Sequence, residues 1–420
     1  MKKIKLGDVL DVKRGTSLSG DYYATSGDLV RLTLGNFNYP DNGFKNNTSK
    51  DDIYFSGTVK KEFVLNKGDI ITPLTEQVRG LLGNTATIPE SNKYIQSGDI
   101  GLIISNEELL DKRFAYYLVS SPIVKKQLDA GSQQTKIRHT SPDKIKDCIA
   151  YIPELEEQRK IAQLLDGINA KIELNNEIND NLQQLIQSVY SYWFNQFEFP
   201  DVNGKPYASN GGTFIYNEQL KRNIPTGWTV ETLRHNTLFK YIDTGVLPFD
   251  SKNYLATANV NGTTITDGEW ITFANREGRA NMQPSIYSVW FAKMKNSVKH
   301  IFIPCNGQWM IDKYIFSTGF SGVQCIEETF AYVACLIQAP FFEKTKDILS
   351  HGATQQSVNN DDLDAIKIPV PPQDILRKFA LEINPIFNKI CILQKENQEL
   401  YAQREYLLPL LLNGQITIQD

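Results

Sequence analysis

Side chains that can hydrogen-bond the edges of nucleic-acid bases gather in several polar stretches of this sequence. Arg, Lys, Asn and Gln do this in the major groove of DNA, while other basic groups and backbone amides bind phosphates. The most basic stretch has one acidic residue, Glu277, among five cations: Arg276, Arg279, Lys293, Lys295 and Lys299. A solvated loop followed by a strand explains this stretch equally well.

Polar segments elsewhere contain the same residue types. We expect residues 75–80 and 134–139 to form loops in the first half of the chain, and residues 355–359 to form one in the second half. For each residue the alternative is ordinary solvated-loop chemistry. The candidate DNA-binding residues are Asn36, Gln77, Arg79, Gln134, Lys136, Arg138, Arg276, Arg279, Asn281, Lys293, Lys295, Gln355, Ser357 and Asn359.

Motifs for catalysis are missing from the sequence. It has no Gly-x-x-x-x-Gly-Lys-Ser/Thr loop for ATP phosphates, and Pro371-Pro372-Gln373 lacks the acid or amide and the aromatic residue of an adenine methyltransferase motif. The four histidines, His139, His235, His300 and His351, do not have metal-ligand spacing. We therefore predict no catalytic residue, metal or cofactor. Two alternatives stay open: a DNA-modifying enzyme with an unrecognised active site, and a coiled-coil scaffold that binds only proteins.

Composition limits the kind of protein further. A chain of 420 residues with 41% hydrophobic residues can form two or three folded domains. Its five scattered cysteines predict reduced thiols, and no segment offers about 18 consecutive apolar residues, so we expect a cytoplasmic protein without a membrane span. The net charge of −4 argues against a nucleic-acid partner, but residues 156–200 hold 7 acidic and 3 basic side chains, so acid is concentrated outside the candidate loops.

The elements that must position these loops occur twice. Gly131-Ser132-Gln133-Gln134 recurs as Gly352-Ala353-Thr354-Gln355, and Arg159-Lys160-Ile161-Ala162 recurs as Arg377-Lys378-Phe379-Ala380. The period is near half the chain, which indicates a tandem duplication of whole domains. Because a motif shared by both halves cannot distinguish two targets, we expect the Gly-Gln loops to bind phosphate or to support packing, and specificity to depend on segments that differ.

Within each half the pattern predicts a mixed α+β domain. Strands are expected over 63–65 and 70–71 with a Lys-Gly-Asp turn between them, and over 100–105, 289–292 and 300–303. A helix is expected over 112–128 despite Pro122, and residues 329–338 form either a helix or a buried strand.

Two long helices carry the sharpest periodic signal. Apolar residues alternate at spacings of three and four from 161 to 193 and from 376 to 411, which is a heptad pattern and favours pairing of the two helices. Asn175, Asn179 and Asn397 at seam positions would fix the register, and Gly167 and Pro385 predict an equivalent bend or break in both helices. The predicted helix-pairing residues are Ile161, Leu165, Ile168, Ile172, Leu182, Ile186, Val189, Phe379, Ile383, Ile386, Ile390, Leu393, Leu400 and Leu407.

These motifs resemble a known family. Residues 131–134 through 152–162 are similar to the region that ends a target-recognition domain in the specificity subunits of type I restriction-modification enzymes. Residues 192–194, 204–207 and 224–228 resemble the linker into the second such domain. The resemblance covers essentially the whole chain, although Glu154 and the segment Asp374-Ile375-Leu376 depart from the family pattern.

The resemblance implies two similar target-recognition domains separated by two long helices that form an antiparallel coiled coil with pseudo-twofold symmetry. It implies a bipartite double-stranded DNA target, two methyltransferase subunits and restriction-translocase subunits as partners, and a prokaryotic cytosolic location. S-adenosylmethionine, ATP and Mg²⁺ would belong to those partners, since the subunit itself is not an enzyme. The implied segments are recognition domain 1 (1–155), central helix (156–199), linker (200–225), recognition domain 2 (226–372), C-terminal helix (373–412) and tail (413–420).

Overall fold

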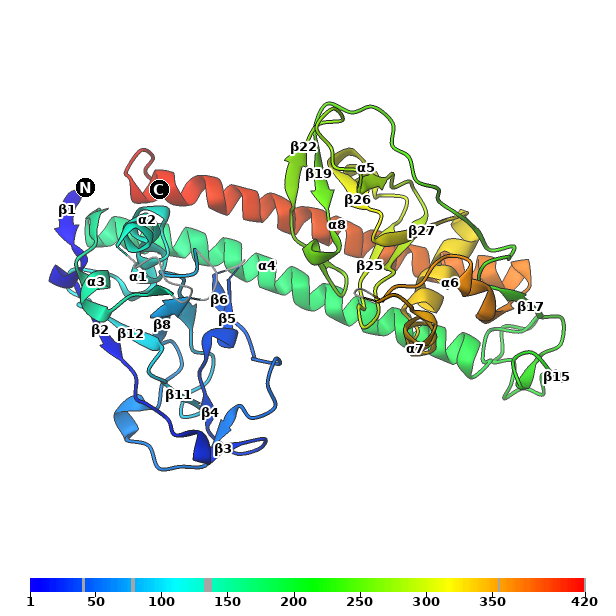
Figure 1. Cartoon of the computed structure of the whole chain (residues 1–420), viewed down its shortest axis with the longest axis horizontal. Coiled ribbons are helices and arrows are strands. Elements are labelled where there is room, and N and C mark those ends of the chain that lie inside the picture. Colours follow the sequence, from blue (N-terminus) through cyan, green and yellow to red (C-terminus); the bar gives the residue numbers. More distant parts are fainter. Residues whose placement is uncertain (40–41, 77–79, 132–137, 354–355, 419–420) are drawn as a thin grey trace. The chain divides into compact units, whose positions relative to one another are not determined.

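The computed structural model describes residues 1–39, 42–76, 80–131, 138–353 and 356–418. The chain folds into two compact units: unit 1 contains Met1–Ile172 and Glu399–Asp420, and unit 2 contains Glu173–Gln398. Both units combine helices with mostly antiparallel sheets, which confirms the predicted α+β class (Figure 1).

Unit 1 is built on an antiparallel sheet with the strand order β10-β8-β12-β2. In β2, Leu10 and Val12 are buried while Asp11 and Lys13 are exposed, so one face of this edge strand packs on the core. A second sheet has the order β11-β4-β7-β3, and β1 pairs with β14. The strands are β1 (Lys2–Lys5), β2 (Leu10–Arg14), β3 (Tyr23–Ala24), β4 (Val30–Arg31), β5 (Phe37–Asn38), β6 (Gly43–Phe44), β7 (Tyr54–Phe55), β8 (Ile70–Pro73), β9 (Thr75–Glu76), β10 (Ala86–Thr87), β11 (Tyr94–Ile95), β12 (Ile100–Ser105), β13 (Arg138–His139) and β14 (Ile149–Ile152).

The segment predicted as one helix over 112–128 is two helices, α1 (Lys112–Val119) and α2 (Pro122–Ala130). Pro122 occupies the first turn of α2, where its missing N–H costs nothing, and the Ser121 side chain accepts a hydrogen bond from the N–H of Val124. Proline therefore starts a helix here instead of interrupting one. A short helix, α3 (Pro142–Lys146), follows in unit 1.

The strand predicted over 63–65 is also wrong. A 3-10 turn covers Lys61–Phe63. Val64 then pairs with Ile95 of β11 through a single bridge, which is too short to form a strand. The predicted turn is confirmed at Gly68, which has a φ of 86° in the left-handed region that glycine adopts readily. The strand over 100–105 is confirmed as β12.

Unit 2 contains a main sheet with the order β18-β27-β24-β25 and a second sheet with the order β22-β19-β26-β23. The predicted strands at 289–292 and 300–303 are confirmed, and residues 329–338 are helical. The elements are β15 (Phe214–Asn217), β16 (Arg222–Pro225), β17 (Thr229–Thr232), β18 (Phe239–Tyr241), β19 (Lys252–Leu255), β20 (Val260–Asn261), β21 (Thr264–Ile265), β22 (Glu269–Ile271), β23 (Ala280–Met282), β24 (Ser288–Ala292), β25 (His300–Ile303), α5 (Gln308–Lys313), β26 (Tyr314–Ser317), β27 (Phe320–Cys325), α6 (Glu327–Gln338), α7 (Pro340–Leu349) and β28 (Lys367–Val370).

The same strand order occurs in both units. The order β10-β8-β12-β2 of unit 1 corresponds, in chain sequence and pairing, to β25-β24-β27-β18 of unit 2. The pair β1–β14 corresponds likewise to β17–β28, and a helix pair follows the last long strand in each case. The repeated motifs of the sequence thus have a structural counterpart in the repeated topology.

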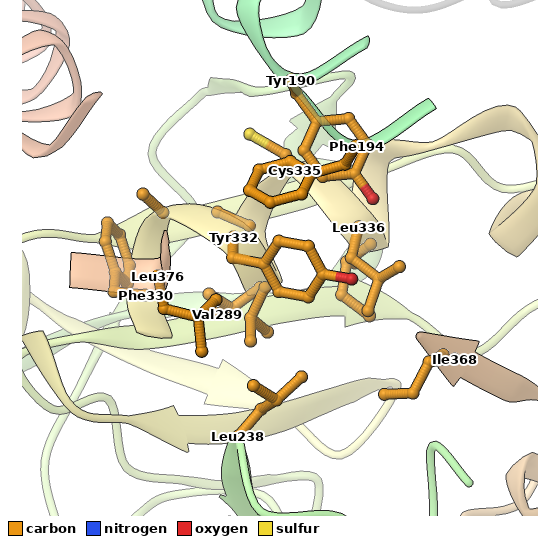
Figure 2. Packing of buried hydrophobic residues seen from close by; sticks show 14 of the residues in the cluster. Tyr190, Phe194, Leu238, Val289, Phe330, Tyr332, Cys335, Leu336, Ile368 and Leu376 are labelled. Atoms are coloured by element: carbon orange, nitrogen blue, oxygen red, sulfur yellow. The ribbon is translucent and has the colours of Figure 1, made fainter. Parts of the chain in front are cut away.

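Helix α6 forms the centre of the unit 2 core. It is apolar on all sides, and every residue from Thr329 to Ile337 is buried. Figure 2 shows Tyr190 and Phe194 on one side of this helix and Val289 and Leu238 on the other. The hydroxyl of Tyr332 is also buried and donates to the carbonyl of Pro369 at 2.5 Å, which ties α6 to β28.

Two long helices complete the fold, α4 (Leu155–Tyr190) and α8 (Gln373–Leu412). Neither is broken at Gly167 or Pro385, so a break, one of the two predicted alternatives, is wrong. Buried apolar residues on either side of Pro385, Ile383 and Phe387, hold that part of α8 in the unit 2 core. A π-helical turn over Ser191–Asn195 follows α4 and buries Trp193 and Phe194.

Within each unit a part of α4 lies beside a part of α8. In unit 2, Asn175 donates from its side-chain amide to the Asn397 oxygen at 2.8 Å, and the Tyr190 and Phe379 rings are 6.4 Å apart. Residue numbers rise along α4 as they fall along α8, so these segments are antiparallel. In unit 1, Arg404 donates to the Asn169 side chain at 2.8 Å.

The predicted helix-pairing residues lie mostly in the two cores. In unit 1 the buried ones are Ile161, Leu165, Ile168 and Ile172, while Leu400 and Leu407 are half-buried. In unit 2 the buried ones are Ile186, Phe379, Ile383, Ile390 and Leu393, and the half-buried ones are Leu182, Val189 and Ile386.

All five cysteines are free. Burial raises the pKa of the Cys148 and Cys391 thiols to about 11, so both are protonated at neutral pH. Within the described ranges, no helix is long and apolar enough to cross a membrane.

Candidate nucleic-acid interface

Two candidate stretches of unit 2 that are far apart in the sequence, around Lys295 and Gln356, are joined in the fold. Met294 and Ser357 form an antiparallel bridge. Beside it the Lys295 N–H donates to the Gln356 carbonyl at 2.9 Å, and the Val358 N–H donates to the Lys293 carbonyl at 3.0 Å. The loop after β24 and the segment after α7 therefore present their side chains together.

The Arg279 segment joins the same group through the turn between β26 and β27. The Thr318 N–H donates to the Arg279 carbonyl at 2.9 Å, and the Lys293 N–H donates to the Gly319 carbonyl at 3.0 Å. Four loops of unit 2 thus meet at one place, which gives the candidate interface a connected backbone.

The two arginines of this interface differ in how many contacts their side chains make within the protein. Arg276 donates to the Phe273 carbonyl at 2.7 Å and lies 3.9 Å above the Phe273 ring. Arg279 is exposed, and its guanidinium makes no hydrogen bond or ion pair to another described residue. Arg279 is therefore the arginine that can contact a ligand without breaking an internal contact.

The remaining candidates of unit 2 vary in exposure. Lys295 is exposed and donates to the Gln356 side-chain oxygen at 2.8 Å. Lys293 is half-buried, and this burial lowers the pKa of its ammonium group. Asn359 is exposed and lies 3.2 Å from the His351 ring nitrogen, whereas Ser357 and Asn281 are half-buried. Gln355 lies outside the described residues.

In unit 1 the two predicted loops start from adjacent strands. β9 pairs with β13, so that Glu76 lies opposite Arg138. Four candidates of unit 1, Gln77, Arg79, Gln134 and Lys136, lie outside the described residues. Their predicted contacts with DNA stay predictions.

Two candidates of unit 1, Asn36 and Arg138, use their side chains for contacts inside the fold. Asn36 is 1% exposed; its oxygen accepts from the Thr33 N–H at 2.9 Å and its amide donates to the Lys45 carbonyl at 3.3 Å. The Arg138 side chain is 14% exposed and contacts Glu76 at 3.0 Å and Asp129 at 2.6 Å. Both side chains therefore satisfy buried polar groups inside unit 1, and their predicted contacts with DNA stay predictions.

Comparison with known proteins shows which family the chain resembles. Residues 1–184 match the family model described as the Type I restriction modification DNA specificity domain. The chain is thus similar to the specificity subunits of type I restriction-modification enzymes.

Two relatives and one solved structure extend this match beyond residue 184. The chain is 25% identical over 328 residues to the specificity subunit of type I restriction enzyme MjaIX from Methanocaldococcus jannaschii, covering 73% of this chain and 69% of the relative. It is 23% identical over 414 residues to the HindI specificity subunit from Haemophilus influenzae, covering 86% and 88%. The crystal structure of a type I restriction-modification S subunit from M. genitalium has the same fold, with a TM-score of 0.55 and 16% identity over 98% of this chain and 96% of that one.

Equivalent positions in the two halves of this chain carry different chemistry. The Glu76–Arg138 pair of unit 1 corresponds to Lys295 and Gln356 in unit 2. In each unit the first residue follows an inner strand of the main sheet, β8 or β24, and the second follows the Gly-Gln motif. A carboxylate and a guanidinium thus occupy one position, and an ammonium and an amide occupy the other.

Sequence reasoning missed a group of buried charges in unit 2. His300, treated as an ordinary histidine, lies 2.9 Å from Glu343, and Glu343 lies 2.6 Å from Lys346. The Glu-x-x-Lys spacing was visible on a helix, but its burial was not. In the part of the chain that the structure describes, no three His, Cys, Asp or Glu side chains are placed to hold a metal ion.

Proposed function

We propose that this chain is the specificity subunit of a type I restriction-modification enzyme and recognises a bipartite DNA sequence, with one half-site read by the recognition domain of each unit. The observation that carries the proposal is the repetition of one strand order with unlike side chains at equivalent loop positions, such as Glu76 and Lys295. A shared framework suits a common way of approaching the duplex, and different loops suit different bases.

The long helices would set the spacing between the half-sites. The antiparallel contacts inside each unit, Asn175 with Asn397 and Asn169 with Arg404, support an antiparallel coiled coil along α4 and α8. The 36 residues of α4 extend about 54 Å at ~1.5 Å per residue. This length exceeds the ~34 Å between successive major-groove faces, so the helix is long enough to separate two domains that each enter one groove face.

In this role the chain supplies recognition and no catalysis. Two methyltransferase subunits would dock on the helices and the adjoining domain surfaces, and restriction-translocase subunits would join them. S-adenosylmethionine, ATP and Mg²⁺ would bind to these partners. The assembly would act in the prokaryotic cytosol.

The proposal can be tested by mapping methylated bases in a genome that carries this chain and its methyltransferase partner. Deleting the gene for this chain should abolish methylation at one split motif while other methylated motifs persist. Methylation that continues unchanged at every motif would reject the recognition role. Turnover of S-adenosylmethionine by the purified chain alone would reject the non-catalytic assignment.

A further inference from the structure

A buried ammonium group lies beneath the basic loop of unit 2. Lys346 on α7 is completely buried, and its Nζ donates to the carbonyls of Ala292, Met294 and Ser297 at 3.4, 3.3 and 3.0 Å. These three carbonyls belong to β24 and the loop that follows it. One side chain from a helix thus binds the start, the middle and the end of the same loop.

Carboxylates complete the charge balance around Lys346. Its Nζ lies 2.6 Å from the Glu343 carboxylate and 3.5 Å from that of Asp347. Burial raises the pKa of the Glu343 carboxyl, but the His300 and Lys346 contacts outweigh burial and leave its pKa below the usual value. A buried cation is costly without such partners, so the group acts as a unit.

The second carboxylate also holds the loop. Asp347 accepts a hydrogen bond from the Asn296 N–H at 3.0 Å, and Asn296 has a φ of 55°, in the left-handed region. Helix α7 therefore binds three carbonyl groups of β24 and this loop through Lys346, and one N–H group of the loop through Asp347. The carbonyls point inward to Lys346, while Lys295 on the same loop is exposed.

We infer that Lys346 is a positioning residue for DNA recognition by unit 2: it fixes the backbone of residues 293–297 so that Lys293 and Lys295 reach the duplex, without touching DNA itself. This inference rests on the proposed function. It explains why a charge that contacts no solvent occurs under a loop with three lysines, where an apolar residue would fill the same volume at lower cost.

Unit 1 has a comparable arrangement with the opposite sign. Glu76 is 1% exposed, and its carboxylate accepts from the N–H groups of Leu81 and Leu82 at 2.7 and 3.0 Å. Arg138 balances this buried charge at 3.0 Å. In unit 1 a buried anion holds backbone amides of the corresponding loop, where unit 2 uses a buried cation to hold carbonyls.

The test uses the full chain assembled with its methyltransferase partner and duplexes that carry the mapped target. Lys346→Met removes the ammonium but keeps the approximate side-chain length. The double variant Glu343→Gln/Lys346→Met also removes the carboxylate, which would otherwise be left with only its His300 partner. Lys344→Met, at an exposed position of the same helix, is the matched control. Asp347→Ala deletes the Asn296 contact and the longer, 3.5 Å contact with Lys346, and gives a second, milder variant that does not depend on burying a new group.

We expect the double variant to regain the thermal stability lost in Lys346→Met but to bind the target about tenfold more weakly than wild type. Discrimination should fall only at the half-site that Arg279→Ala also affects, and amide exchange of Lys295 and Asn296 should accelerate. A general loss of stability would weaken both half-sites equally. Asp347→Ala should lose discrimination at the same single half-site, to a smaller extent. Lys344→Met should bind like wild type.

Two results separate this inference from the proposed function. If wild type does not distinguish the target from a scrambled duplex, the proposed function itself fails. If wild type distinguishes them and the double variant or Asp347→Ala does so equally well, the positioning role of Lys346 is rejected while recognition stands.

Discussion

Asn175 on α4 donates a hydrogen bond to the side chain of Asn397 on α8 at 2.8 Å, in a layer of unit 2 where both residues are buried. Asn397 donates in turn to Asn176 at 2.8 Å. Amides between two apolar helix faces lower stability but specify one register, because any shift leaves them without partners.

Replacing one member of this pair should destabilise unit 2. In Asn397→Leu the Asn175 amide loses a buried partner, and the free energy of unfolding should fall by about 1–3 kcal/mol. The double variant Asn175→Leu/Asn397→Leu should recover most of this loss, because both polar groups are gone. Denaturant titration measures both, with Asn181→Ala at an exposed position of α4 as the control. A double variant as unstable as the single one would contradict a role for the pair in specifying register.

Arg279 should contribute directly to target binding. Its exposed guanidinium makes no internal contact among the described residues, so Arg279→Ala should weaken binding to the cognate site by about 1–3 kcal/mol without lowering stability. Titration of the assembled complex at fixed salt measures the change. Arg276→Ala is the comparison, and its effect should be smaller since Arg276 packs on Phe273. Equal affinity of wild type and Arg279→Ala would exclude this contact.

Glu76 should stabilise unit 1 strongly. Glu76→Gln keeps the volume but leaves the Arg138 guanidinium, which is mostly buried, with less compensating charge. Removing one partner of a buried ion pair costs about 3–5 kcal/mol, and the remaining Asp129 contact should hold the loss near the lower end. Thermal unfolding of the variant should show this loss, whereas Glu62→Gln, at an exposed position, should unfold like wild type. An unchanged midpoint for Glu76→Gln would show that Asp129 alone balances Arg138.

Glu343 should make the stability of unit 2 depend on pH. Its pKa in the folded chain is below the usual value: burial raises it, and the contacts with His300 and Lys346 lower it further than burial raises it. A carboxyl with a depressed folded-state pKa stabilises the fold above its unfolded pKa, and this stabilisation is lost as the pH falls through the folded-state pKa.

The measurement compares unfolding midpoints of wild type and Glu343→Gln from neutral pH to below about 4, near the ordinary carboxyl pKa. Wild type should lose more stability on acidification than the variant, so that the two curves converge at low pH. Parallel curves over the whole range would show that Glu343 does not titrate with folding.

Local sequence patterns alone determined much of this protein. The heptad spacing of Ile161, Leu165 and Ile168 identified α4, because a 3.6-residue period is a property of the helix itself. The duplicated Gly-Gln motifs identified two copies of one domain, and the run from Val289 to Ala292 identified a strand that is buried on both faces.

Tertiary structure alone decided the features that depend on residues far apart in the chain. Pro122 starts a helix because Ser121 caps it, Pro385 stays within α8 because the unit 2 core holds its neighbours, and Asn36 and Arg138 face inward because buried groups need their hydrogen bonds. From the sequence alone, Lys346 would be expected to be an exposed, solvated lysine. Its burial becomes visible only when α7 packs under the loop after β24, since the free energy of a charge depends on its surroundings and not on its own residue type.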